Sequence, residues 1–172
     1  MQNEIVNRVA ESGIITLDLE DYFPQSAIEV FDLKDFLFQG LVLREKDFRE
    51  ALKNFDWKNY EGKVVAVCCS ADAIVPTWAF MLAATYLEKV SLFCGFGTAS
   101  EILSQYYSWK LAQEITAEKF TGQRVVVKGC SNKPVPASAF VEASRLLLPF
   151  VKSLMFGETC SSVPLWKKKN EA

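Results

Sequence analysis

Three short apolar runs typical of β-strands recur along the chain, and each is followed by a longer segment typical of a helix. The runs occupy positions 64–68, 90–94 and 125–127, and the segments after them cover about 76–87, 99–113 and 136–156. The runs have the length of strands and the segments that of helices, the last interrupted by Pro149. Strands that are apolar on both faces and are joined by helices pair in parallel. The pattern therefore predicts an α/β fold, a layered sheet with three parallel β-α units in residues 63–156.

The first 62 residues are acidic and less regular. Residues 14–19 alternate between apolar and polar, as in a half-buried strand, and we expect this strand to add to the edge of the sheet. Phe48, Leu52 and Phe55 recur at helical spacing, which predicts an amphipathic helix that ends near Asp56. Residues 27–43 are apolar without a clean period, so strand and helix both stay open there.

We expect one domain over residues 1–172, because no stretch rich in Gly, Ser or Pro marks a linker. In this interpretation residues 1–62 form an extension packed on the 63–156 core, and residues 157–172 form a loop and a basic tail. The predicted helix at 76–87 carries large apolar side chains on nearly every side. Core packing is the expected role of these residues, Trp78, Phe80, Met81 and Leu82.

Composition and charge restrict the partners of the protein. Half of its 172 residues are hydrophobic, the formal net charge is −2 and the pI is near 5.3, which gives no global attraction to nucleic acid or anionic lipid. The N-terminus has an acid at position 4, and the longest uncharged run, 73–87, is too short to cross a bilayer. We therefore expect a cytoplasmic protein with no nucleic-acid and no membrane partner.

The chain contains no histidine. This excludes Ser-His and Cys-His nucleophile pairs, histidine zinc ligands and an imidazole that titrates near neutrality. Acid–base chemistry would depend on carboxylates, Lys, Tyr or Cys.

The cysteines follow the predicted strands. In a reducing compartment an odd set of five is expected as thiols or thiolates rather than as structural disulfides. Binding crevices in parallel sheets lie at the carboxyl ends of the strands, which share one edge. Four cysteines end or closely follow a predicted strand, so we expect sulfur atoms to gather at that edge: Cys68, Cys69, Cys94 and Cys130.

A Cys-Ser pair followed by Val-Pro occurs three times in the chain. The pairs begin at Cys69, Cys130 and Cys160, and the first two lead to Pro76 and Pro136, which we expect at the first position of a helix. A helix N-terminus lowers the pKa of a thiol, and this favours the thiolate that binds a metal or attacks an electrophile. We therefore predict metal ligands and further cofactor-binding groups, the ligands being Cys69, Cys130 and Cys160 and the other groups Ser70, Asp72 and Ser131.

Thiolates without histidine suit zinc or an iron–sulfur cluster held by three sulfurs and a fourth ligand. Candidates for the fourth ligand are Cys94, Asp72 or an exogenous thiol. The chain has no C-x-x-C spacing, which argues against a zinc ribbon or a thioredoxin-type pair. Cysteine is also an ordinary core residue. That interpretation is favoured for Cys68 and Cys94 and stays open for Cys69 and Cys130.

Four stretches together resemble a family of small cytoplasmic bacterial proteins catalogued as a domain of unknown function. They are residues 40–49, 69–79, 128–130 together with 134–136, and 157–164, and the similarity spans nearly the whole chain. The resemblance implies no established activity and carries no catalytic roles. It implies a genomic setting near iron–sulfur cluster assembly genes, and with it iron–sulfur assembly proteins as partners. The matching motifs contain Cys69, Cys130 and Cys160.

Three functions are compatible with these features. The first is a thiolate site that binds a metal or iron–sulfur cluster, in cluster assembly or transfer. The second is a sulfur-transfer enzyme with Cys69 or Cys130 as nucleophile, assisted by Asp72 or Lys128. The third is a non-catalytic oligomeric or adaptor protein in which the cysteines are structural. A homo-oligomer is compatible with all three.

Overall fold

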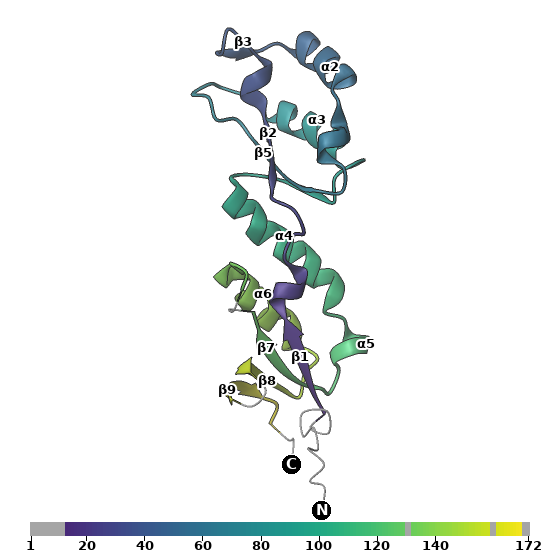
Figure 1. The fold of residues 1–172 in the computed structure, drawn as a ribbon, viewed down its shortest axis with the longest axis vertical. Helices are drawn as coiled ribbons and strands as arrows, with labels where there is room; N and C mark the ends of the chain where they lie inside the picture. Colours follow the sequence, from purple (N-terminus) through teal and green to yellow (C-terminus); the bar gives the residue numbers. More distant parts are fainter. Residues whose placement is uncertain (1–12, 130–131, 159–160, 170–172) are drawn as a thin grey trace, which may run out of the picture. The chain divides into compact units, whose positions relative to one another are not determined.

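The computed structural model describes residues 13–129, 132–158 and 161–169 (Figure 1). The chain divides into two compact units, named here unit 1 (residues 1–23 and 107–172) and unit 2 (residues 24–106). The second division point falls within helix α4 (Ala99–Glu114). Each unit contains a sheet with parallel strands, so the predicted α/β class with parallel β-α units is confirmed. The expectation of one domain stays a prediction.

The sheet of unit 2 has three parallel strands in the order β2 (Glu29–Asp32), β5 (Val64–Cys68) and β6 (Phe93–Phe96). Helix α3 (Thr77–Leu87) connects β5 to β6. Four of the five residues of β5 are buried, as expected of a strand covered on both faces. The unassigned region 27–43 forms β2, the 3-10 turn η2 (Leu33–Phe36) and a short hairpin, β3 (Leu37–Phe38) with β4 (Val42–Leu43).

A cluster of aromatic side chains forms part of the core of unit 2. The ring of Phe31, on β2, lies 5.3 to 5.8 Å from four other rings, those of Phe36, Phe55, Trp57 and Tyr60. The predicted amphipathic helix is α2 (Glu45–Asn54), which buries Phe48 and Leu52 in the same core. The turn η3 (Trp57–Tyr60) supplies the last two rings. Large rings contribute much apolar area, so this small unit has a substantial core.

The sheet of unit 1 has the order β1 (Ile14–Asp18), β7 (Arg124–Lys128), β8 (Ser153–Glu158) and β9 (Ser161–Lys167). The first three strands are parallel and β9 is antiparallel to β8. The turn η1 (Leu19–Tyr22) follows β1, helix α5 (Ala117–Phe120) precedes β7, and α6 (Ala137–Leu147) joins β7 to β8. The Tyr107 hydroxyl, on α4, donates to the Leu19 carbonyl at 2.9 Å.

The predicted helix at 136–156 is wrong in its second half, because α6 ends at Leu147 and residues 153–158 form β8. Pro149 cannot continue a helix, and the apolar run after it pairs with β7 on one side and β9 on the other. Pro76 and Pro136 lie one position before the first helical residue, at the N-cap. The strands also form separate sheets rather than one, with β1 and β2 as edge strands, as expected for the N-terminal strands.

The two units repeat one β-α-β arrangement. The three elements of this arrangement begin 60 positions later in unit 1 than in unit 2: 64 and 124, 77 and 137, 93 and 153. The hydrogen bonds repeat at the same shift, since the Gly62 amide donates to the Val90 carbonyl at 2.9 Å and the Gly122 amide to the Phe150 carbonyl at 2.8 Å. A position in one unit can therefore be compared directly with its counterpart in the other.

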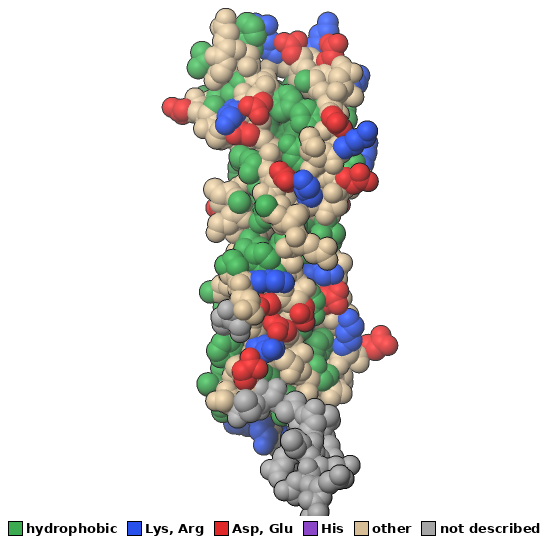
Figure 2. Space-filling view, in the orientation of Figure 1, with side chains coloured by type: hydrophobic (Ala, Val, Ile, Leu, Met, Phe, Trp, Pro, Cys, Tyr) green, Lys and Arg blue, Asp and Glu red, His purple; other side chains and the backbone are tan. Residues whose placement is uncertain are grey.

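The described part of the chain has no helix that is both long and apolar enough to cross a membrane. Figure 2 shows one face, on which Lys and Arg side chains are interspersed with Asp and Glu.

Candidate functional site

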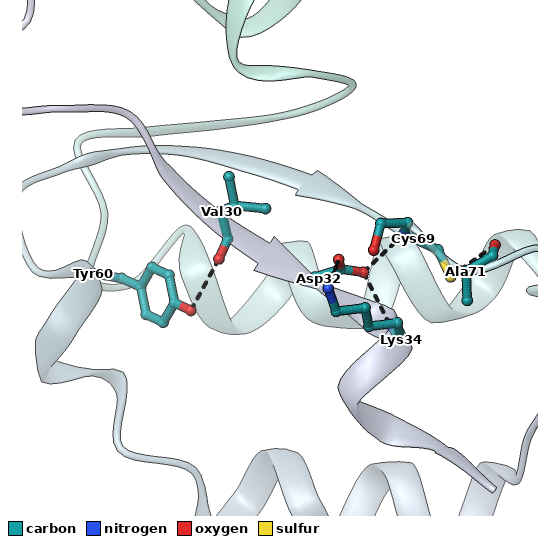
Figure 3. A network of polar contacts seen from close by, with 7 residues as sticks. Val30, Asp32, Lys34, Tyr60, Cys69 and Ala71 are labelled. Carbon is teal, nitrogen blue, oxygen red and sulfur yellow. Dashed lines mark hydrogen bonds and ion pairs between the residues drawn. The ribbon is translucent and has the colours of Figure 1, made fainter. Parts of the chain in front are cut away.

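Asp32 organises the carboxyl end of the sheet in unit 2 (Figure 3). One of its carboxylate oxygens accepts from the Lys34 amide and from the Ser70 amide, both at 3.0 Å, and the other pairs with the Lys34 ammonium at 3.4 Å. Burial alone would raise the pKa of Asp32, but the hydrogen bonds from Ser70 and Lys34 outweigh it and lower the pKa to about 2. The carboxylate is therefore charged and well satisfied, and it anchors the loop after β5.

The described cysteines of unit 2 lie around this loop and along the sheet. The Cys69 thiol is half-buried, packs against the aromatic core and donates weakly to the Ala71 carbonyl at 3.8 Å. Burial raises the pKa of Cys68, and the charge of Asp32 raises it further. Burial and the neighbouring Glu88 likewise raise the pKa of Cys94. Cys68 and Cys94 are therefore neutral thiols near pH 7.

The other predicted groups divide between exposed residues and positions outside the described part. Ser70 and Asp72 are exposed in the loop after β5. Cys130, Ser131 and Cys160 lie outside the described residues. Within 13–129, 132–158 and 161–169, no three Cys, Asp or Glu side chains are grouped so as to hold a metal ion.

The expectation that one sheet edge gathers the cysteines is wrong, because Cys69 follows β5 and Cys130 follows β7, which belong to different sheets.

The repeated Cys-Ser pairs are displaced by one position from the 60-position repeat of the two units. Gly129, with φ +143°, takes the place of Cys69 in unit 1, and a Cβ there would lie 2.9 Å from the Cβ of Leu19. That position has no room for a cysteine. The ligand set Cys69, Cys130 and Cys160 stays a prediction.

An ion-pair network stands at the carboxyl end of the sheet in unit 1. The Lys128 ammonium lies 3.1 Å from Asp18 and 3.8 Å from Glu158, and these pairs raise the pKa of Lys128, the hydrogen bond to Asp18 most of all. The Asn132 amide donates to the Glu20 carboxylate at 3.0 Å. Lys128 is thus a charged structural partner of two carboxylates, which makes it a poor base for a nucleophile.

An apolar groove lies between α3 and β6 in unit 2. Its volume is about 490 Å³, and its lining includes Phe80 and Met81 from the helix and Cys94 and Phe96 from the strand. The rings of Phe80 and Phe96 meet edge to face at 5.0 Å. Met81 and Phe96 are each 65% exposed. The expected core role is therefore wrong for Met81.

Helix α4 supports the opposite face of β6. A Cβ at Gly95 would lie 2.5 Å from Oε1 of Gln105 and 2.9 Å from Cδ1 of Ile102, so α4 sits directly on this strand. The Gln105 side-chain amide donates to the Phe96 carbonyl at 3.1 Å. The wall that carries Cys94 and Phe96 is thus held from behind. Sequence reasoning missed this groove because apolar side chains look alike in a core and on a surface; the one signal available was that α3 is apolar on nearly every side.

Comparison with known proteins assigns the chain to a family. No curated protein and no solved structure matches it. A family model described as "Protein of unknown function (DUF2480)" matches residues 3–168, nearly the whole chain. The chain therefore belongs to the DUF2480 family of proteins of unknown function.

Proposed function

We propose that the protein is a non-catalytic oligomeric or adaptor protein that binds a polypeptide segment through the groove between α3 and β6. The observation that carries the proposal is the apolar lining of this groove, with Met81 and Phe96 each 65% exposed on its two walls. Large apolar side chains grouped on a surface mark contact sites more often than isolated ones do. Its volume of about 490 Å³ also falls in the usual range of binding pockets.

The form of the groove favours a polypeptide as ligand. One wall is the outermost strand of the described sheet in unit 2, since β6 pairs with β5 on one side and no described strand pairs with its other side. An extended segment can add to such an edge by main-chain hydrogen bonds and place alternate side chains in the adjoining groove. The raised pKa of Cys94 keeps its thiol neutral there, which suits an apolar contact.

The dye 1-anilinonaphthalene-8-sulfonate, whose fluorescence rises on apolar surfaces, tests the proposal with the full chain in a dilution series. We expect saturable enhancement that weakens several-fold in Met81→Ser. Leu41→Ser is the matched control, because Leu41 is 64% exposed and lies outside the groove, on the hairpin of unit 2. Absence of enhancement at every dilution, or equal loss in both variants, would contradict the proposal.

A further inference from the structure

We propose that the partner at this groove is a second copy of the chain, whose β6 pairs antiparallel with β6 to join the two sheets of unit 2 into one. This inference rests on the proposed function and names its ligand. The internal repeat supports it, because unit 1 contains the same strand edge in a covered form.

In unit 1 the outer edge of β8 is covered by β9, which runs antiparallel to it. Position 154 corresponds to Cys94 and position 156 to Phe96. Leu154 lies opposite Trp166 of β9, and Phe156 lies opposite Val163. The covering strand thus places apolar side chains beside the two positions whose counterparts face the groove in unit 2.

Exposure differs between the two edges as expected from this cover. Leu154 is only 2% exposed, whereas its counterpart Cys94 is half-buried. Phe156 is 37% exposed and Phe96 is 65% exposed, although both rings make the same edge-to-face contact with a helix phenylalanine. The edge of β6 therefore resembles the edge of β8, except that no strand among the described residues covers it.

Strand β6 of a second copy has the apolar side chains needed to cover the open edge of β6. Cys94 and Phe96 point to one face of β6, because side chains alternate, and Leu92 comes directly before the strand. If two β6 strands pair around Cys94, Leu92 of one copy lies beside Phe96 of the other, and both are exposed apolar residues in the single chain. Both copies use the same residues in this contact, so it closes as a two-fold symmetric dimer.

Strand β9 of another copy is a poorer partner for this edge. Pro164 interrupts its main-chain donors, and β9 against β6 would be a head-to-tail contact that leaves further edges open. An open apolar strand edge is a template for pairing with another chain, and a closed pair removes the β6 edge from solvent.

Sedimentation velocity and thiol cross-linking test the inference on the full chain. We expect a dimer whose dissociation constant rises about 100-fold or more in Phe96→Lys, because a charge is placed at the seam. Leu41→Lys, a charge on an equally exposed apolar residue elsewhere in unit 2, should remain dimeric. Near-ultraviolet circular dichroism checks that both variants fold.

The second measurement needs no disruptive variant. Opposite residues of antiparallel strands have Cα atoms about 4.5–5.5 Å apart, within the range that a disulfide spans. Mild oxidation in air with copper phenanthroline, in which Cu(II) passes the two electrons of the thiol pair to dioxygen and the two protons are released, should therefore link Cys94 to Cys94 between copies. Peptide mass spectrometry identifies the link. Cys94→Ser should abolish it, whereas Cys68→Ser, at the end of β5 and outside the groove lining, should leave it in place.

A chain that stays monomeric up to about 100 μM, well above a typical specific affinity, overturns the inference. A dimer that is insensitive to Phe96→Lys and forms no Cys94 link overturns it as well. In either case the proposed function survives if the dye still binds in a Met81-dependent way. If dye binding fails at every dilution, the proposed function fails whatever the mass.

Discussion

Phe80 and Phe96 meet edge to face at 5.0 Å in unit 2, and Phe140 and Phe156 repeat this contact at 5.8 Å in unit 1. Each pair joins the helix of a β-α-β unit to its last strand. In unit 1 the strand of the pair has a further neighbour, β9, and in unit 2 none is present among the described strands. The same local contact therefore serves a covered edge in one unit and an apolar groove in the other.

Asp32→Asn should destabilise the protein by about 1–2 kcal/mol, since it removes the charge that the hydrogen bonds of Ser70 and Lys34 stabilise. The pKa of Asp32 is lowered from 3.8 to about 2, so its contribution is complete above about pH 4 and is lost as the pH falls through about 2. Urea unfolding between pH 2 and pH 7 measures this. Asp72→Asn is the control, because Asp72 is exposed in the adjoining loop. Equal pH profiles for wild type and Asp32→Asn would contradict the assignment.

Gly129→Ala should cost about 3 kcal/mol or more, because the new Cβ meets Leu19 in a backbone conformation that other residues rarely adopt. The closest atoms would be the Leu19 Cβ at 2.9 Å and the Leu19 backbone nitrogen at 3.3 Å. Gly40→Ala tests conformation alone, since Gly40 has φ +70° and nothing within 4 Å of its would-be Cβ, and about 1 kcal/mol is expected there. Thermal unfolding ranks the two variants. An equal loss of stability in the two variants would mean that the close contact between Leu19 and position 129 is unimportant.

Tyr107→Phe should destabilise the protein by about 1–2 kcal/mol, because the buried Leu19 carbonyl loses its 2.9 Å donor. Tyr60→Phe is the matched control. Its hydroxyl reaches the Val30 carbonyl at 3.4 Å in an exposed setting, and removing it should cost under about 0.5 kcal/mol. Chemical denaturation of both variants measures the difference, and a smaller loss for Tyr107→Phe than for Tyr60→Phe would contradict the expectation.

The predicted thiolate site is tested by metal and acid-labile sulfide analysis of the full chain purified without oxygen. If Cys69, Cys130 and Cys160 bind a metal or a cluster, the metal should be lost when all three are changed to Ser. It should be retained when Cys68 and Cys94, whose thiol pKa values are raised by burial, are changed instead. A colourless, metal-free wild type whose three thiols react independently would refute this prediction.

Local pattern was sufficient for the elements whose own residues carry a period. The alternation at 14–19, the helical spacing of Phe48, Leu52 and Phe55, and the apolar run at 64–68 correspond to β1, α2 and β5. Each of these signals is made by neighbours in the chain, so no distant contact is needed to interpret it.

Tertiary structure decided what depends on partners from elsewhere in the chain. Residues 153–158 are a strand because β7 and β9 pair with them. The assignment of β5 and β7 to separate sheets likewise decided that strand ends alone do not bring Cys69 and Cys130 together. An apolar side chain is stabilised by leaving water, and this follows from the sequence alone. The fold determines which surface covers that side chain, because burial depends on what packs against it and not on the residue itself.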